Sequence, residues 1–194
     1  MIRSLVGLVA TSLLCCGTSA YAANCMDSGE GAAWKAAYPT LYSQLMGYFT
    51  CIDDPNDPVA CNVFVARAAE GTYGVTDFKQ ADGTYMPANT IMNVVKSNAA
   101  WSKLGSANSQ SVLNDAAAGA QDHFIIAVMS DQPHGHVAIV LPGVPQPSGT
   151  WKLSAPNSAS AFLGNVSKAY VFCRLSWAFQ DPAKVEIWWR PKGN

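Results

Sequence analysis

The sequence predicts an α+β fold in which helices come first and an antiparallel sheet follows. Helical periodicity dominates from about residue 30 to residue 119. After Gly119, short segments rich in β-branched and aromatic residues alternate with turns that contain Pro, Gly, Asp and Ser. Short connections favour antiparallel pairing of such segments, and helices followed by strands are typical of the α+β class.

The first 22 residues are predicted to be a secretory signal peptide. Arg3 precedes an apolar run from Leu5 to Cys16, and the small-residue cleavage site Ala20-Tyr21-Ala22 follows. The run is too short to span a bilayer, which takes roughly 20 apolar residues, and no later segment comes near that length. Cleavage after Ala22 leaves 194 − 22 = 172 residues. We therefore expect one domain over residues 23–194, exported to the periplasm or medium and monomeric.

Four helical segments are predicted. The first carries aromatic and leucine side chains at helical spacing, and Pro39 must kink or divide it. The second has Asp57 as its cap, Pro58 in its first turn, and Gly71 or Gly74 at its end. The predicted helices span residues 30–50, 58–70, 88–97 and 109–119.

Four strands are predicted in the second half of the chain. Each is rich in Val, Ile, Phe, Tyr or Trp and is bounded by turn residues. The segment from Pro142 to Thr150 is interpreted as a loop, either a substrate loop or a plain surface connection. The predicted strands span residues 123–129, 136–142, 168–174 and 185–190.

Charge and ligand spacing exclude several classes of protein. The chain has 12 basic and 13 acidic residues and no basic tract, so nucleic acid is not an expected partner. No carboxylate or thiol stands at a recurring ligand spacing from His123, His134 and His136, which argues against zinc. Prolines interrupt Asp53, Asp54 and Asp57, whose better interpretation is turn and cap formation rather than calcium binding. We expect no metal and no cofactor.

Removing the signal peptide leaves four of the six cysteines: Cys25, Cys51, Cys61 and Cys173. In an exported chain these cysteines can form two disulfides, in which case Cys61 is an inert bridge. The competing interpretation keeps Cys61 free and joins two of the other three. Cys25–Cys51 and Cys51–Cys173 are the two favoured pairings in that case.

The chemistry of the chain is predicted to centre on Cys61 and His136. Cys61 follows the turn residues of DPNDPVAC and begins an apolar-periodic helix, where open backbone N–H groups and the helix dipole favour a thiolate. His136 opens the short strand in HGHVAIVLPG, a setting that can present an imidazole to a neighbouring helix end. A nucleophilic cysteine with a base histidine downstream is the order found in papain-like cysteine hydrolases.

Three segments together resemble the NlpC and CHAP type of papain-like hydrolases, bacterial enzymes that cut amide bonds in cell-wall peptides. They are CNVFVARAAEG, the segment from Pro87 to Leu104, and HGHVAIVLPG. The resemblance covers residues 59–142 and implies a nucleophilic cysteine at a helix start, a general-base histidine at a strand start, and an orienting polar residue on the next strand. Ala60 and Asn62-Val63 around Cys61 depart from the common Asp-Cys-Ser-Gly motif.

From these residues we expect an ion pair of Cys61 and His136, attack of the sulfur on an amide carbonyl, and protonation of the leaving amine by the imidazolium. Asn157 is the preferred orienting residue and Ser154 the reserve. The backbone N–H of Cys61 is the expected oxyanion donor, helped by Tyr48 or Gln44. His134 is interpreted as a loop or subsite residue, and His123 as structural.

The function predicted from sequence is a secreted cysteine amidase or endopeptidase that acts on peptidoglycan peptides, with a cognate inhibitor or immunity protein as a further partner. Two alternatives remain. One is an acyltransferase on the same scaffold, in which an amine resolves the thioester. The other is a non-catalytic, disulfide-stabilised binding or inhibitor protein, for which the number of free thiols is the discriminating observation.

Overall fold

The computed structural model describes residues 25, 29–49, 63–130, 135–163 and 168–193. Over these residues the chain is α+β, with N-terminal helices packed on a C-terminal antiparallel sheet. The described sheet has six strands in the order β1-β6-β2-β3-β4-β5. The expected fold class is confirmed at this level. The signal peptide, residues 1–22, lies outside the described residues.

The helices follow the sequence pattern closely. Pro39 divides the first predicted segment into α1, Gly29–Ala37, and α2, Pro39–Met46. Helix α5, Phe64–Tyr73, begins after Val63 and not at residue 58, where the predicted span 58–70 starts. It ends at Gly74, whose φ of 66° is the left-handed C-cap conformation that glycine adopts without strain. Helices α6, Ala88–Ser97, and α7, Gln110–Gly119, match the predicted spans within one residue.

The sheet contains more strand than the sequence predicted. Strands β2, His123–Met129, β5, Tyr170–Arg174, and β6, Val185–Pro191, correspond to predicted strands. Strand β3 extends to Ser148 from His136, so the segment from Pro142 onward is not a loop. Strands β1, Ser102–Ser106, and β4, Leu153–Ser160, were not predicted. Their sequences, SKLGS and LSAPNSAS, lack β-branched residues, and neighbouring strands override this weak local preference.

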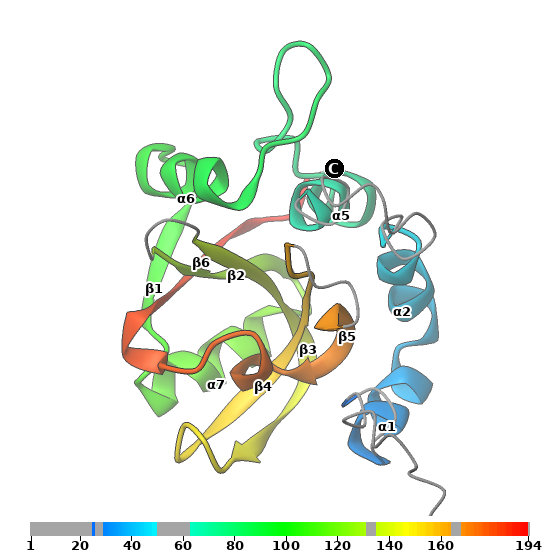
Figure 1. Cartoon of the computed structure of the whole chain (residues 1–194), viewed down its shortest axis with the longest axis vertical. Coiled ribbons are helices and arrows are strands. Elements are labelled where there is room, and N and C mark those ends of the chain that lie inside the picture. Colours follow the sequence, from blue (N-terminus) through cyan, green and yellow to red (C-terminus); the bar gives the residue numbers. More distant parts are fainter. Residues whose placement is uncertain (1–24, 26–28, 50–62, 131–134, 164–167, 194) are drawn as a thin grey trace, which may run out of the picture.

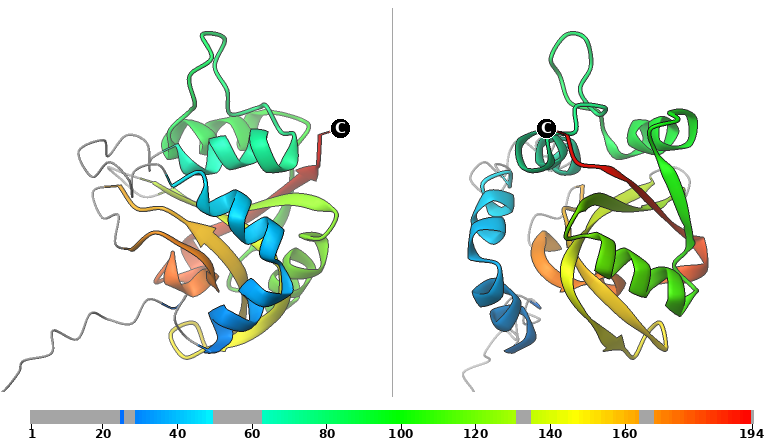
Figure 2. Two further views of the ribbon diagram at one scale, coloured as in Figure 1. Left: turned by 90° about the vertical axis from the view of Figure 1, so that its right-hand side faces the viewer. Right: turned by 180° about the vertical axis from the view of Figure 1, so that it is seen from behind.

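Helices cover both faces of the sheet. Alternate residues of β3 divide between two buried clusters, as the two-residue repeat of a strand requires. Val137, Ile139 and Leu141 join the cluster that includes side chains of α1, α2, α5 and α6. Ala138 and Val140 join the cluster formed with α7. Figure 1 shows α1 and α2 along one side of the molecule, and the view from behind in Figure 2 shows α7 lying across the strands.

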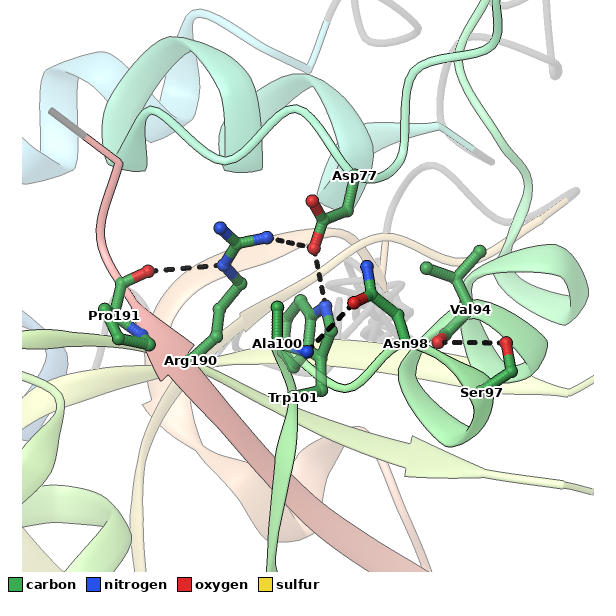
Figure 3. A network of polar contacts seen from close by, with 8 residues as sticks. All are labelled: Asp77, Val94, Ser97, Asn98, Ala100, Trp101, Arg190 and Pro191. Carbon is green, nitrogen blue, oxygen red and sulfur yellow. Dashed lines mark hydrogen bonds and ion pairs between the residues drawn. The ribbon is translucent and has the colours of Figure 1, made fainter.

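A polar cluster fixes strand β6 to the segment after α5. The carboxylate of Asp77 accepts hydrogen bonds from Trp101 Nε1, at 2.7 Å, and from Arg190. Asp77 and Arg190 are an ion pair whose side chains are only 16% and 19% exposed. Figure 3 shows these three residues, from three different segments, meeting at one point. The cluster holds the end of β6 against the helical layer.

No helix in the described part of the chain is both long enough and apolar enough to cross a membrane.

Candidate functional site

A pocket of about 300 Å³ opens where the first residues of α5 and α6 meet the beginning of β3. Its size is at the lower end for ligand pockets. Most of the lining residues are apolar, and one asparagine and one histidine are among them. The lining residues are Phe64, Val65, Pro87, Ala88, Asn89, Ile91, Gly135, His136, Val137, Ala161 and Leu163.

The sequence places the start of α5 at this pocket for a packing reason. Phe64, Val65 and Ala68 are buried against the sheet, so the N-terminal half of the helix is fixed there. His136 and Val137 alternate along β3: Val137 packs with α5 and α6, whereas the His136 ring contacts Phe179 of the cluster on the α7 side. Both residues line the pocket at this end of the strand. Cys61 lies outside the described residues, three positions before Phe64 in the chain.

The imidazole of His136 is held by Ser160 on the neighbouring strand β4. Nε2 lies 2.8 Å from Ser160 Oγ, and Ser160 Oγ lies 3.5 Å from the carbonyl oxygen of Val137. The hydroxyl can donate to Nε2 or accept from Nε2–H, and the Val137 carbonyl, which can only accept, is compatible with the Nε2–H tautomer. This tautomer leaves Nδ1 unprotonated, as a general base requires.

Aromatic side chains surround the same imidazole. Phe162 stacks on it with ring centroids 4.6 Å apart, and Phe179 approaches edge-on at 5.2 Å. Burial in this apolar setting disfavours the charged form and lowers the pKa of His136 from 6.5 to about 4. The described surroundings therefore favour a neutral imidazole over the imidazolium of the ion pair expected from sequence.

The structure does not bring Asn157 to His136. Asn157 is fully buried, pairs with Leu141 in the sheet, and donates from Nδ2 to the carbonyl oxygen of Pro142 at 3.2 Å. Leu141 is five residues along β3 from His136, roughly 17 Å at the rise of a strand. Ser154, the reserve, is further along β4 still, and its backbone contacts Gln110. The contact with the imidazole that the sequence analysis expected of Asn157 is made by Ser160.

Ser160 was not identified from the sequence because the strand that carries it was not predicted. The resemblance implied a polar orienting residue on the strand after that of His136, but no strand was predicted over residues 153–160. Once β4 is recognised, the register Ile139↔Ala159 places Ser160 beside the first residues of β3. The sequence does contain a polar residue at the end of LSAPNSAS. Its position beside His136 follows only when the pairing register of β3 and β4 is known.

Neither expected oxyanion side chain lies at the start of α5. Tyr48 packs against the C-terminal half of α5: its hydroxyl accepts from Thr72 Oγ1 at 3.4 Å, and a Cβ at Gly71 would meet that hydroxyl at 2.1 Å. Gly71 is seven residues beyond Phe64, about 10 Å along the helix axis. Gln44 is an exposed residue of α2. These positions do not support an oxyanion role for either residue.

The two described histidines, His123 and His136, lie at opposite ends of β2. His123 begins β2, its Nδ1 lies 3.3 Å from the carbonyl oxygen of Gly119, and its ring meets Trp189 edge-on. His134 lies outside the described residues, as do Asp53, Asp54 and Asp57. Within the described ranges no three His, Cys, Asp or Glu side chains are grouped closely enough to hold a metal ion.

The structure pairs Cys25 with Cys173 as a disulfide, with Cα atoms 5.7 Å apart. This pairing differs from both that the sequence favoured, Cys25–Cys51 and Cys51–Cys173. The bridge lies in a small buried cluster with Tyr170, against which Phe162 packs. Of the four cysteines after the signal peptide, Cys51 and Cys61 remain, and both lie outside the described residues.

No known protein-family profile and no curated protein sequence matches this chain.

Proposed function

We propose that this protein is an exported cysteine amidase or endopeptidase of papain-like architecture, which hydrolyses amide bonds in peptidoglycan peptides with Cys61 as nucleophile and His136 as base. One observation carries the proposal: the first turn of α5 and the first residues of β3 line the same pocket. The two elements that the sequence reasoning paired are therefore neighbours in space.

Chain connectivity supports the role of Cys61. Cys61 precedes Val63 by two residues, so its Cα is within about 7 Å of the Val63 Cα whatever the local conformation. Val63 immediately precedes α5, and the next two residues, Phe64 and Val65, line the pocket with His136. The chain length between Cys61 and Val63 is therefore short enough for the thiol to reach the pocket that His136 lines.

The environment of His136 supports a general-base mechanism. Neutral Nδ1 takes the proton of the Cys61 thiol as the sulfur bonds to the scissile carbonyl carbon. The imidazolium then protonates the amine nitrogen as the carbon–nitrogen bond breaks, and water hydrolyses the thioester. Ser160 on β4 orients the ring through Nε2. It lies on the strand next to that of His136, as the resemblance to NlpC and CHAP enzymes implies for the orienting residue.

The proposal is tested by digesting purified sacculi with the mature protein and identifying the released fragments by mass spectrometry. Wild-type protein should release peptide fragments, and Cys61→Ala should release none. Cys51→Ala is the matched control, since it removes the other unassigned cysteine and should leave the release intact. Equal release by wild type and Cys61→Ala would overturn the proposal.

A second arm uses histidine substitutions. His136→Ala should lower the rate by about two orders of magnitude or more, the scale of general acid–base catalysis, while the protein stays folded. His134→Ala should cost much less. The reverse ranking would assign the base to His134 and contradict the mechanism.

The same digest separates the two alternatives from hydrolysis. An acyltransferase would give fragments that carry an added amine in place of the new carboxylate. A binding or inhibitor protein would release nothing in wild-type form. The Cys25–Cys173 bridge makes this last alternative more specific. A protein in which all four cysteines form disulfides would have to join Cys51 to Cys61.

A further inference from the structure

Helix α6 is tied to the start of β3 by one side chain. Asn89 Oδ1 accepts a hydrogen bond of 2.7 Å from the backbone N–H of Gly135, 46 residues away in sequence. Asn89, near the N-terminus of α6, and Gly135, next to His136, both line the pocket. The bond therefore joins two walls of the candidate active site immediately before the proposed base.

A side chain at Gly135 would require its neighbours on α6 and β2 to shift. A Cβ at Gly135 would lie 2.3 Å from Met92 Cε, 2.8 Å from Asn89 Oδ1 and 2.9 Å from the carbonyl oxygen of Met129. Glycine permits this approach, but it also has the widest backbone freedom of all residues. A contact that restrains Gly135 consequently has a direct influence on the backbone position of His136.

We propose that Asn89 is a positioning residue for His136, acting through Gly135. Asn89 restrains the backbone before His136, while Ser160 restrains its ring through Nε2, so the two contacts together fix the position of the imidazole. This inference rests on the proposed function of His136 as the base. It assigns a role in that chemistry to a residue of α6.

A purely structural role predicts a different outcome. The bond is exposed, so water replaces it at a cost of about 1 kcal/mol or less in stability. Misplacing a reacting group by about 1 Å, in contrast, costs up to a hundredfold in rate. Loss of the bond should thus appear in turnover and not in the melting temperature.

The test compares Asn89→Ala with Asn93→Ala, an exposed asparagine one turn further along the same helix. The substrate is a synthetic peptide that contains the bond found to be cut in the sacculus digest. Asn89→Ala should lower kcat on it by about ten- to a hundredfold with little change in KM, and Asn93→Ala should leave kcat unchanged. Asn89→Asp keeps an oxygen that accepts from Gly135 and should restore most of the rate. Wild-type kcat in Asn89→Ala would overturn the inference.

A readout without turnover separates failure of this inference from failure of the proposed function. The ¹⁵N resonances of the His136 imidazole and the Gly135 amide are recorded by NMR in Cys61→Ala protein. Adding Asn89→Ala should shift both sets, and adding Asn93→Ala should shift neither. Unshifted His136 resonances in the Asn89→Ala protein would overturn the positioning role even if the wild-type enzyme cuts sacculi. If the resonances shift but the wild-type protein does not cut sacculi, the positioning of His136 by Asn89 would be supported and only the proposed hydrolase activity would be rejected.

Discussion

Ser160 Oγ lies 2.8 Å from Nε2 of His136, across the neighbouring strands β4 and β3. The same hydroxyl is 3.5 Å from the carbonyl oxygen of Val137. The pair is enclosed by Phe162 and Phe179, so the imidazole is held in one orientation inside an apolar shell. This arrangement leads to the first prediction.

Replacing Ser160 by alanine should reduce kcat by about tenfold or more, because the ring loses the group that fixes its orientation. Cys61 should remain open to alkylation by iodoacetamide, since its own chain segment is unchanged. Turnover of sacculus peptides and the alkylation rate are measured on the same preparation.

Ser154→Ala is the matched control for that substitution, on the same strand but at its opposite end. It should retain full activity. Full activity in Ser160→Ala with loss in Ser154→Ala would mean that the register of β4 assigned to the site is incorrect.

Asn157→Ala should affect stability and not turnover. The amide donates to the carbonyl oxygen of Pro142 in a fully buried site, and its own Oδ1 has no hydrogen-bond partner among the described residues. Losing the donor costs about 1 kcal/mol in the free energy of unfolding, partly offset by removing the unpaired oxygen. Urea unfolding measures the first effect and sacculus digestion the second. A large loss of kcat at unchanged stability would contradict this prediction and assign Asn157 the orienting role expected from the sequence.

Local sequence pattern predicted much of the fold. Strand β2 and helix α6 agree with their predicted spans because each has a clear apolar periodicity and distinct ends. Strand β4 was not predicted because its sequence, LSAPNSAS, is polar. Its residues from Ala155 to Ser160 are buried in the sheet, where β4 lies between β3 and β5. Such a strand depends on contacts that are distant in sequence.

The same distinction applies to the site. His136 and the existence of helix α5 were predicted from local motifs, and the structure places both at one pocket. The start of the helix was placed at residue 58 and lies at Phe64. Ser160 and Asn89 were missed because their relevance comes from register and from helix packing, which no local motif encodes. The Cys25–Cys173 pairing likewise joins residues separated by 148 positions, for which spacing gives no guide.

Acid should destabilise the protein through His136. Burial lowers its pKa from 6.5 to about 4, so as the pH falls below 6.5 the unfolded chain binds a proton that the folded protein does not. The stabilisation is complete above pH 6.5 and is lost progressively down to about pH 4, by about 3 kcal/mol in total. Urea unfolding between pH 4 and 8 measures this dependence.

His136→Gln should flatten that pH dependence, because glutamine does not titrate. His123→Gln, which replaces the histidine at the start of β2, should leave it in place. An unchanged slope in His136→Gln would show that other groups cause the acid destabilisation.

Asp77→Ala should destabilise the protein by about 2 kcal/mol, because it leaves the indole N–H of Trp101 and the guanidinium of Arg190 without their acceptor in a largely buried setting. Asp77→Asn keeps an oxygen for Trp101 and should have an intermediate effect. Thermal unfolding provides the comparison, with the exposed Asp122→Ala as control. Stability equal to that of Asp122→Ala would contradict the structural role of the cluster in Figure 3.

The central claim is that Cys61 is a free nucleophile beside His136, and the most direct test is a thiol map of the active, unreduced mature protein. The protein is alkylated with iodoacetamide, digested, and analysed by mass spectrometry without reduction. We expect a linked Cys25–Cys173 peptide together with alkylated Cys61. A peptide in which Cys61 is joined to Cys51 by a disulfide, in protein that still releases fragments from sacculi, would contradict the claim.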